Sequence, residues 1–321
     1  MNTETPTAQT TVTHPAISIV GVPKSGTSSL HSWLDQLPGV CGSNPKETFY
    51  FMDEGNPLTN QKLCFENDQC RSYFRFFRNL KPGELTLDST THYFFQQAAM
   101  DQLAAAGTKI CVVLREPATR LISYFQYVCE TRDATRTEVD FGEFVDGLLN
   151  DDVSRFRESF FEEREFFALK TSLKQGHYAD YLLRWKKQVA SENLLVVLFE
   201  DLVANQERVL ADIGKFFQIS VGENELEMPQ DNETYKPKYP LINRFARWAS
   251  RKIVSERVKR PIRRFYLKFQ KSKVQDIYSL YPQHVKALKQ YYVAPIKQFN
   301  KVSGIATTKY WSKKNSFIAQ S

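Results

Sequence analysis

The apolar residues change their spacing early in the chain, on either side of a short polar loop. A largely apolar run over residues 16–20 ends at Gly21, as a buried strand would. After the loop, apolar residues recur at helical spacing, at Leu30, Trp33, Leu34 and Leu37. The pattern therefore predicts a strand, a tight loop and a helix in direct succession.

Further apolar runs of strand length alternate with segments of helical periodicity. The other predicted strands are 40–41, 85–88, 109–114 and 194–199. The predicted helices are 118–130, 178–189, 203–217 and 284–292, and the charged stretch 133–175 is also expected to be helical. Such alternation is typical of a parallel sheet covered on both faces. We expect an α/β protein with a three-layer P-loop-type fold, a central, mostly parallel sheet and helices on both faces. It would form one domain over residues 16–311, between polar tails at 1–15 and 312–321.

The loop after the first strand concentrates groups that bind anions. It consists of Pro23, Lys24, Ser25, Gly26, Thr27, Ser28 and Ser29. The start of a helix presents backbone N–H groups and the positive end of the helix dipole. Lys24 adds a full positive charge, and the hydroxyl side chains add donors. We expect the loop to bind a phosphate-like group; the plainer alternative is an ordinary strand–turn–helix with a solvated lysine.

The loop departs from the Walker A pattern, which places a lysine directly after its second glycine and a hydroxyl residue beside it for magnesium. Gly21 and Gly26 have the spacing of that pattern. Lys24, however, precedes the second glycine, and Thr27 stands in the position of the lysine. A nucleoside triphosphate with its metal therefore fits poorly. A kinase with a degenerate loop stays an alternative.

A second cluster follows the predicted strand 109–114. Arg115 stands at the strand end, and Ser123 lies about two turns into the next helix. Ligands of parallel α/β sheets bind beyond the carboxyl ends of the strands, where the loop also lies. A guanidinium and a hydroxyl at this spacing can hold a second phosphate between them. The alternative is a structural Arg115 that caps the helix or pairs with Glu116.

The two motifs, PKSGTSS and LREPATRLIS, resemble the signatures of the sulfotransferases that use 3′-phosphoadenosine 5′-phosphosulfate (PAPS). The pattern is most similar to heparan-type sulfotransferases and their bacterial relatives. The resemblance implies PAPS as donor, adenosine 3′,5′-bisphosphate (PAP) as product and no metal. It also implies that residues 23–29 hold the 5′-phosphosulfate and that Arg115 and Ser123 hold the 3′-phosphate. The chain departs from the family at Glu116, where aspartate is usual, and at Ser89, where heparan-type enzymes carry a lysine. Lys46 or Ser89 would then supply part of the stabilisation that this lysine gives to the sulfo group.

The implied reaction is attack of an acceptor on sulfur, with the 5′-phosphate of the donor leaving. Lys24 is the natural cation to stabilise the leaving oxygen. A general base must take the acceptor proton, and we choose Glu47, because the matching segment carries the catalytic glutamate of heparan-type enzymes. We expect the aromatic run 49–51 beside Glu47 to raise its pKa while Lys24 lowers it. His92 is the alternative base, since cytosolic sulfotransferases use a histidine.

Composition indicates the class of protein and its compartment. The chain has 321 residues, of which 42% are hydrophobic, enough for a globular protein with a sizeable core. The first fifteen residues lack the apolar core of a signal peptide or anchor, and no run of eighteen apolar residues follows. Five cysteines without a CxxC pair argue against a disulfide framework and a structural zinc site. We expect a cytoplasmic protein without a metal.

A formal net charge of +7 and the basic, aromatic segment 243–273 favour anionic partners. Such a segment can bind a polyanion or contact an anionic membrane surface, although it has no recognised nucleic-acid motif. A solvated helical face is the plainer alternative. We expect the acceptor to be a hydroxyl of an anionic carbohydrate or a glycolipid, with a small hydroxylated metabolite as the alternative. A polyanion-binding or membrane-surface protein without catalysis is the alternative from another class, and the oligomeric state stays open.

Overall fold

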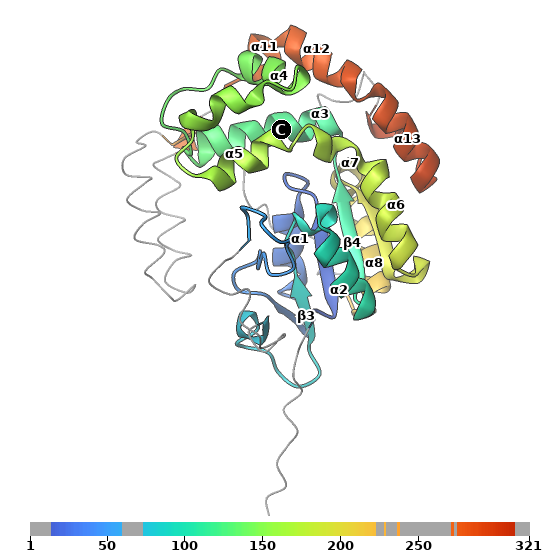
Figure 1. Ribbon diagram of the computed structural model, residues 1–321. Coiled ribbons are helices and arrows are strands. Elements are labelled where there is room, and N and C mark those ends of the chain that lie inside the picture. The colour runs from blue at the N-terminus through green and yellow to red at the C-terminus, as the bar shows by residue number, and fades with distance from the viewer. Residues whose placement is uncertain are drawn as a thin grey trace, which may run out of the picture. The chain divides into compact units, whose positions relative to one another are not determined.

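A computed structural model describes residues 14–59, 73–222, 228, 236–237, 271–272 and 275–311 (Figure 1). The chain divides into two compact units, Met1–Arg115 with Tyr181–Asp231 and Glu116–Asp180 with Asn232–Ser321. The expected single domain over 16–311 stays a prediction. The basic segment 243–273, apart from the backbone of 271–272, lies outside the described residues, as do Cys64, Cys70 and nearly all of both tails.

The first unit is built around a five-stranded, all-parallel sheet with the order β2-β3-β1-β4-β5. Its strands are β1 (Ile17–Gly21), β2 (Val40–Gly42), β3 (Leu85–Asp88), β4 (Lys109–Leu114) and β5 (Leu194–Leu198). Each strand lies within one residue of the range expected at each end. The expected α/β fold with a parallel sheet is confirmed.

Strand β1 is central and is buried along its whole length. Ile17 is in register with Leu87 of β3 on one side and with Lys109 of β4 on the other. After β1 the chain crosses toward β2, and after β4 it crosses the other way, toward β5. The carboxyl ends of β1 and β4 therefore form a topological switch point, where ligands bind in open α/β sheets.

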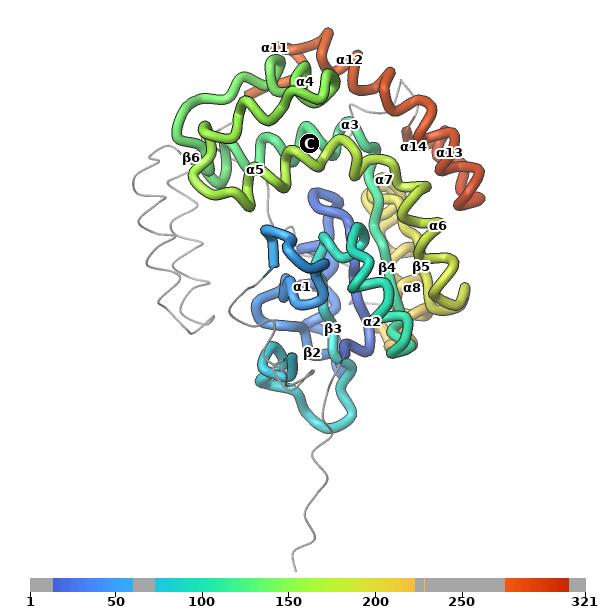
Figure 2. Tube along the Cα trace, viewed as in Figure 1, coloured from blue at the N-terminus to red at the C-terminus, as the bar shows by residue number. Residues whose placement is uncertain are grey.

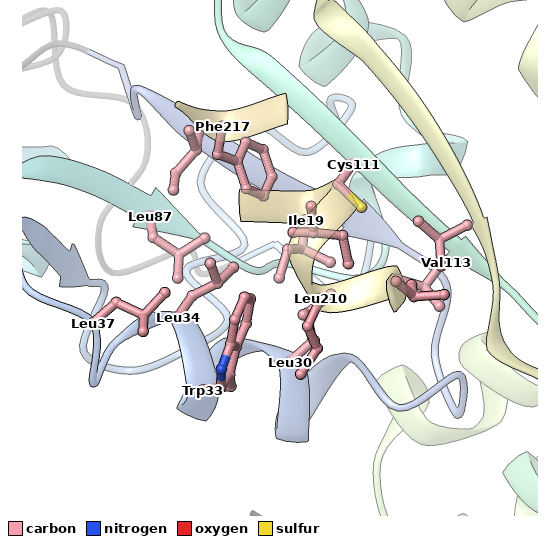
Figure 3. Close-up of a cluster of buried hydrophobic side chains, with 14 of the residues drawn as sticks. Ile19, Leu30, Trp33, Leu34, Leu37, Leu87, Cys111, Val113, Leu210 and Phe217 are labelled. Carbon is pink, nitrogen blue, oxygen red and sulfur yellow. The ribbon is translucent and has the colours of Figure 1, made fainter. Parts of the chain in front are cut away.

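Helices cover both faces of the sheet, because the connections leave it in opposite directions and crossovers are right-handed. On one face, α1 (Thr27–Leu34) and α8 (Gln206–Phe217) meet over the strands; Leu30, Leu34 and Leu210 are among the fully buried side chains there (Figure 3). The other face is covered by α2 (Gln97–Ala105) and residues 181–188 of α6 (Tyr178–Gln188). The indole Nε1 of Trp185 in α6 donates to the Phe94 carbonyl at 3.0 Å.

Two helices of this unit differ from the sequence-based expectation. Helix α2 was not predicted, because its buried face has only three apolar residues, Ala99, Met100 and Leu103, which give a weak periodic signal. The expected helix 203–217 is two helices, α7 (Phe199–Ala204) and α8. They are separated at Asn205, whose backbone is not helical (φ −135°, ψ 48°) and whose side chain donates to Asp201 Oδ1 at 2.7 Å. This local hydrogen bond offers an alternative to the helical pattern.

The second unit is mainly helical (Figure 2). Its helices are α3 (Pro117–Gln126), α4 (Phe141–Leu149), α5 (Glu163–Lys170), α11 (Ile277–Leu280), α12 (Pro282–Tyr291), α13 (Val293–Ser303) and α14 (Thr308–Trp311). The described residues of this unit also form a short antiparallel pair, β6 (Lys236–Pro237) and β7 (Lys271–Ser272). Aromatic rings form much of its core: Phe125 of α3 lies 5.2 Å from Phe141 and 5.5 Å from Phe144, between ring centroids.

Short helical turns connect these elements. They are 3₁₀ helices at Tyr73–Phe76, Tyr93–Phe95, Val153–Ser159, Lys174–Gly176 and Ser191–Asn193, and a π-helical turn at Tyr127–Thr131. The expected helix 118–130 is therefore α-helical up to Gln126, the end of α3, and π-helical from Tyr127 onwards.

Candidate functional site

The loop between β1 and α1 is a sharp turn that places two residues in the left-handed region. Lys24 has φ 69° and Gly26 has φ 75°, and α1 begins directly afterwards. A Cβ atom at Gly26 would lie 2.9 Å from the Phe199 ring, so this position requires glycine for both its space and its φ. Among the described residues, no side chain caps the start of α1. The positive end of the helix therefore has no built-in acceptor that would compete with an anionic ligand.

Ser25 is the loop residue whose surroundings point most directly to a ligand. Its side chain is fully buried, and its Oγ has no hydrogen-bond partner in the described part of the chain. A buried hydroxyl without a partner costs about 1 to 3 kcal/mol. An oxygen of a bound phosphate-like group would satisfy it. Thr27 is also buried, while Ser28 and Ser29 are partly exposed.

Lys24 and Arg115 are brought together at the switch point, as expected from the sequence. The Nη1 of Arg115 donates to the Lys24 carbonyl at 3.1 Å, and its guanidinium lies 5.0 Å from the centroid of the Phe199 ring. Burial lowers the pKa of Lys24 to about 8, and the like charges of Arg115 and Lys46 act in the same direction. A dense positive charge of this kind favours an anion at the carboxyl end of β1.

The second phosphate motif continues into the other unit, where Glu116 is the helix cap. Its carboxylate accepts hydrogen bonds from the backbone N–H groups of Ala118 (3.1 Å) and Thr119 (2.7 Å), and Pro117 takes the first helical position. Capping of α3 is therefore the role of Glu116. Ser123 lies on α3 and is partly exposed. Its pairing with Arg115 on one phosphate stays a prediction.

Glu47 lies beside β3 and is held by a short hydrogen bond. Thr91 Oγ1 donates to Glu47 Oε1 at 2.6 Å, and the Lys46 ammonium lies 3.5 Å from the same oxygen. The expectation of a raised pKa is wrong. Burial does raise the pKa of Glu47, but Lys46, His92 and the hydrogen bonds from Thr91 together lower it below its usual value. The positive charges that lower the pKa of Glu47 are those of Lys46 and His92, whereas the sequence had pointed to Lys24.

His92, the alternative base, is close enough to Glu47 for its charge to act on the carboxylate. Its side chain is buried, with ring centroids 6.0 Å from Phe49 and 6.3 Å from Phe95. The structure thus brings both candidate bases to the same end of β3, and the assignment of the base stays a prediction.

Asp88, the last residue of β3, is a buried acceptor to which the sequence analysis assigned no role. Its carboxylate accepts from Thr48 Oγ1 (2.7 Å), Tyr73 OH (2.9 Å) and both the N–H and the hydroxyl of Thr90 (2.9 and 2.7 Å). The bond from Thr48 joins the residue that follows Glu47 to the end of β3. The available signal was an aspartate at the end of a buried strand, which needs partners when it is desolvated.

His31 and Ser89 form a second contact that the sequence did not reveal. His31 Nδ1 and Ser89 Oγ are 2.8 Å apart, and both side chains are buried. Burial lowers the pKa of His31 to about 3, with Lys46 acting in the same direction. Neutral His31 therefore links α1 to the end of β3 at every physiological pH.

An open hollow in the second unit has a different character. It has a volume of about 750 Å³ and is lined by Glu138, Asp140, Glu143, Arg155, Phe156 and Ser159. Three carboxylates against one guanidinium give it a net negative lining, which disfavours an anionic ligand.

Within the described ranges, no group of three or more His, Cys, Asp or Glu side chains could hold a metal ion. No helix in these ranges is long and apolar enough to cross a membrane.

The proteins and the domain family that are similar to this chain are sulfotransferases. The sulfotransferase domain family matches residues 14–237. Human heparan sulfate glucosamine 3-O-sulfotransferase 3B1 is 26% identical over 216 residues, which cover 63% of this chain and 45% of that protein. Human bifunctional heparan sulfate N-deacetylase/N-sulfotransferase 2 is 25% identical over 221 residues, or 64% of this chain and 22% of that protein. The chain thus spans less than half the length of these relatives. The crystal structure of a sulfotransferase from Alicyclobacillus acidocaldarius has the same fold, with a TM-score of 0.52, 23% identity, and coverage of 74% of this chain and 92% of the other.

Proposed function

Because the chain belongs to the sulfotransferase domain family, we propose that it transfers the sulfo group of PAPS to a hydroxyl group of an acceptor. The observation that carries the proposal is the loop between β1 and α1. A fully buried Ser25 hydroxyl without a partner in the described chain, an uncapped helix start and Lys24 beside Arg115 all favour a bound phosphosulfate. Residues 23–29 would hold the 5′-phosphosulfate, and Arg115 with Ser123 would hold the 3′-phosphate.

In the proposed reaction the acceptor oxygen attacks sulfur in line with the bond that breaks. A new oxygen–sulfur bond forms, the bond between sulfur and the 5′-phosphate oxygen breaks, and its electron pair stays on that oxygen. Lys24 stabilises the charge that develops there. The proton of the acceptor hydroxyl passes to Glu47, and PAP leaves with the second phosphate intact. No metal takes part.

Four observations favour Glu47 over His92 as the base. The hydrogen bond from Thr91 fixes the carboxylate, and its lowered pKa keeps it ionised and able to accept a proton at neutral pH. Its side chain is 32% exposed, which leaves it accessible to an acceptor. His92 is buried among aromatic rings. It remains the alternative base.

We favour a carbohydrate hydroxyl on a polyanionic chain or glycolipid as the acceptor. The net charge of +7 would attract such an acceptor, and the two relatives named above carry heparan sulfate in their names. A small hydroxylated metabolite is the alternative. Peripheral membrane contact through 243–273 would suit the glycolipid case.

The donor is tested first, by thermal unfolding in the presence of nucleotides. PAP without metal should raise the unfolding temperature, because a ligand that binds only the folded state stabilises it. Stabilisation by ATP with magnesium, and none by PAP, would favour the degenerate kinase instead. The acceptor is then tested by incubating the protein with sulfur-35 PAPS and with polysaccharide, lipid and small-molecule fractions of a cell extract. Label confined to the small-molecule fraction would overturn the carbohydrate assignment, and binding to polysaccharide without any label transfer would favour a non-catalytic polyanion-binding protein.

A further inference from the structure

Lys46, which the sequence named with Ser89 as a candidate to contact the sulfo group, takes no part in the reaction steps proposed above. Its ammonium lies 3.5 Å from Glu47 Oε1, and its side chain is 22% exposed. Its backbone is fixed at the sheet edge, since its carbonyl accepts from the Ser43 hydroxyl at 2.9 Å and from the Ser89 N–H at 3.3 Å. A firmly held backbone with a long, partly exposed side chain allows the ammonium to move while Glu47 stays in place.

In the donor-free protein this ion pair opposes the work of Glu47 as a base. Lys46 and His92 are the charges that act on the carboxylate, Thr91 is its hydrogen-bond donor, and all three lower its pKa. A carboxylate whose pKa is lowered is ionised, but it holds an incoming proton weakly. Relief from one positive charge would make it a stronger base.

The position of Lys46 also brings it close to the proposed phosphosulfate loop. The Lys46 carbonyl accepts from the N–H of Ser89, the residue after β3. Strand β3 pairs directly with β1, and β1 leads into the loop. The charge of Lys46 is felt at Lys24 within the loop and at His31 on α1. A sulfo group carried on the loop would therefore add negative charge within the range of the Lys46 ammonium.

We propose that Lys46 exchanges its ion pair with Glu47 for the transferring sulfo group when PAPS binds, so that Glu47 becomes a stronger base only in the donor-loaded enzyme. The inference rests on the proposed function, because it requires a sulfo group on the loop. Lys46 then acts twice, first as a restraint on Glu47 and then as a cation on the sulfo oxygens. The neighbouring imidazole of His31 cannot do this, because it stays neutral.

The first test compares two ligands that differ only in the sulfo group. PAPS and PAP are titrated into wild type, Lys46→Gln and Lys46→Arg by calorimetry, without acceptor. Lys46→Gln should weaken PAPS on the order of tenfold and leave PAP unchanged, and Lys46→Arg should keep most of the PAPS affinity. An equal loss of affinity for PAPS and PAP would show that Lys46 attracts phosphate in general and would overturn the proposal. No loss of affinity for either ligand would overturn it as well.

The second test uses the pH profiles of transfer. The acid limb of kcat/KM for PAPS reports the donor-free enzyme, and that of kcat reports the loaded enzyme. In wild type the acid limb of kcat should lie at a higher pH than the acid limb of kcat/KM. In Lys46→Gln the acid limb of kcat/KM should shift to the pH of the kcat limb, because Lys46 no longer lowers the pKa of Glu47 in the donor-free enzyme. Coincident limbs in wild type would contradict the exchange.

Lys81→Gln is the matched control. Lys81 is an exposed lysine of the same unit, 3.8 Å from its partner Glu84. Its replacement should change neither ligand affinity nor either limb. A wild-type protein that binds neither PAPS nor PAP would refute the proposed function itself, whereas a wild type that transfers sulfo groups with an unaffected Lys46→Gln variant would refute only the exchange.

Discussion

Lys24 and Glu47 have pKa values shifted in the same direction, with opposite consequences for their charge. Burial and two neighbouring cations lower the pKa of Lys24 to about 8, so this cation begins to lose its proton within the range of ordinary assays. The lowered pKa of Glu47 keeps this carboxylate ionised across the same range. The alkaline behaviour of the site therefore depends on Lys24.

Binding of PAP should take up a proton near pH 8. Above this pH Lys24 is increasingly neutral in the free protein, and a bound phosphate raises its pKa again, so that affinity falls as the pH rises. Calorimetry in buffers with different ionisation enthalpies measures the uptake. Lys24→Arg is the control, since arginine stays charged and should remove it. An affinity that is constant from about pH 7 to about pH 9.5 would show that Lys24 does not face the phosphate.

Replacing the proposed base should lower turnover far more than it lowers binding. Glu47→Gln is expected to reduce kcat by about 10²- to 10⁴-fold, because the amide cannot take the acceptor proton. His92→Asn should reduce kcat by less than about tenfold. Steady-state kinetics with saturating PAPS measures both, and circular dichroism checks the fold. The reverse order of effects would assign the base to His92.

Some site residues could be predicted from the sequence because their chemistry is local. Lys24 comes three residues after β1 and Arg115 directly after β4, and parallel strands place their carboxyl ends at one edge. Asp88 and His31 could not be assigned roles, because their partners Thr48 and Ser89 lie 40 and 58 residues away in the chain. The direction of the pKa shift of Glu47 was mispredicted because the aromatic neighbours were given more weight than the adjacent charge of Lys46, which lowers the pKa most. The smaller contributions from His92 and from the hydrogen bond of Thr91 come from residues more than 40 positions away in the chain and could not be seen in the sequence.

At the scale of elements, the turn into α1 depends on one glycine. Gly26 combines a positive φ of 75° with the close approach of Phe199. Gly39 has a φ of 82°, but a Cβ atom added there would meet no atom of the described residues within 4 Å. A comparison of Gly26 with Gly39 therefore separates the effect of backbone strain from the effect of packing.

Gly26→Ala should destabilise the protein more than Gly39→Ala. Both substitutions place alanine in the left-handed region, at a cost of about 1 to 2 kcal/mol. Gly26→Ala adds the clash with Phe199, which must shift from its place over Arg115. Urea unfolding measures the difference, and PAP titration should show weaker binding for Gly26→Ala alone. Equal losses of stability would mean that the Phe199 ring yields freely.

The segment that carries Glu47 is attached to β3 through Asp88. Asp88→Asn places an amide N–H₂ among hydroxyl donors, so we expect a loss of about 2 to 4 kcal/mol in the free energy of unfolding. Asp212→Asn, which alters an exposed pair with Arg208, should cost about 0.5 kcal/mol or less. Urea denaturation compares the two. A loss at Asp88 no greater than at Asp212 would show that the network does not hold the segment.

The strands and α1 were predictable because each is one continuous pattern of apolar residues. The break between α7 and α8 was not, because it depends on a side-chain hydrogen bond from Asn205 to Asp201 inside a sequence with an uninterrupted helical period. Periodicity thus located the sheet that positions the site and missed the places where side chains compete with the backbone.

At the scale of the whole molecule, the net charge of +7 sets the response to salt. Transfer to an anionic polysaccharide at saturating PAPS should slow by about tenfold or more when salt is raised from about 10 to about 150 mM, as the screening length falls from about 30 to about 8 Å. Transfer to an uncharged acceptor, where one is found, is the control and should change little. Equal salt dependence for both would show that salt acts on the donor site.

Gly21, the last residue of β1, and Gly26, in the loop that follows, have a consequence for how sequence changes in this family are interpreted. A Cβ at Gly21 would lie 2.7 Å from Phe94 Cβ, and one at Gly26 would meet Phe199, so both positions are constrained by packing alone. A descendant that lost its donor would still keep these glycines in order to fold. Ser25, whose hydroxyl has no partner in the described chain, is under no such constraint. Divergence at Ser25 beside invariant glycines would therefore mark the members of a lineage that have given up catalysis.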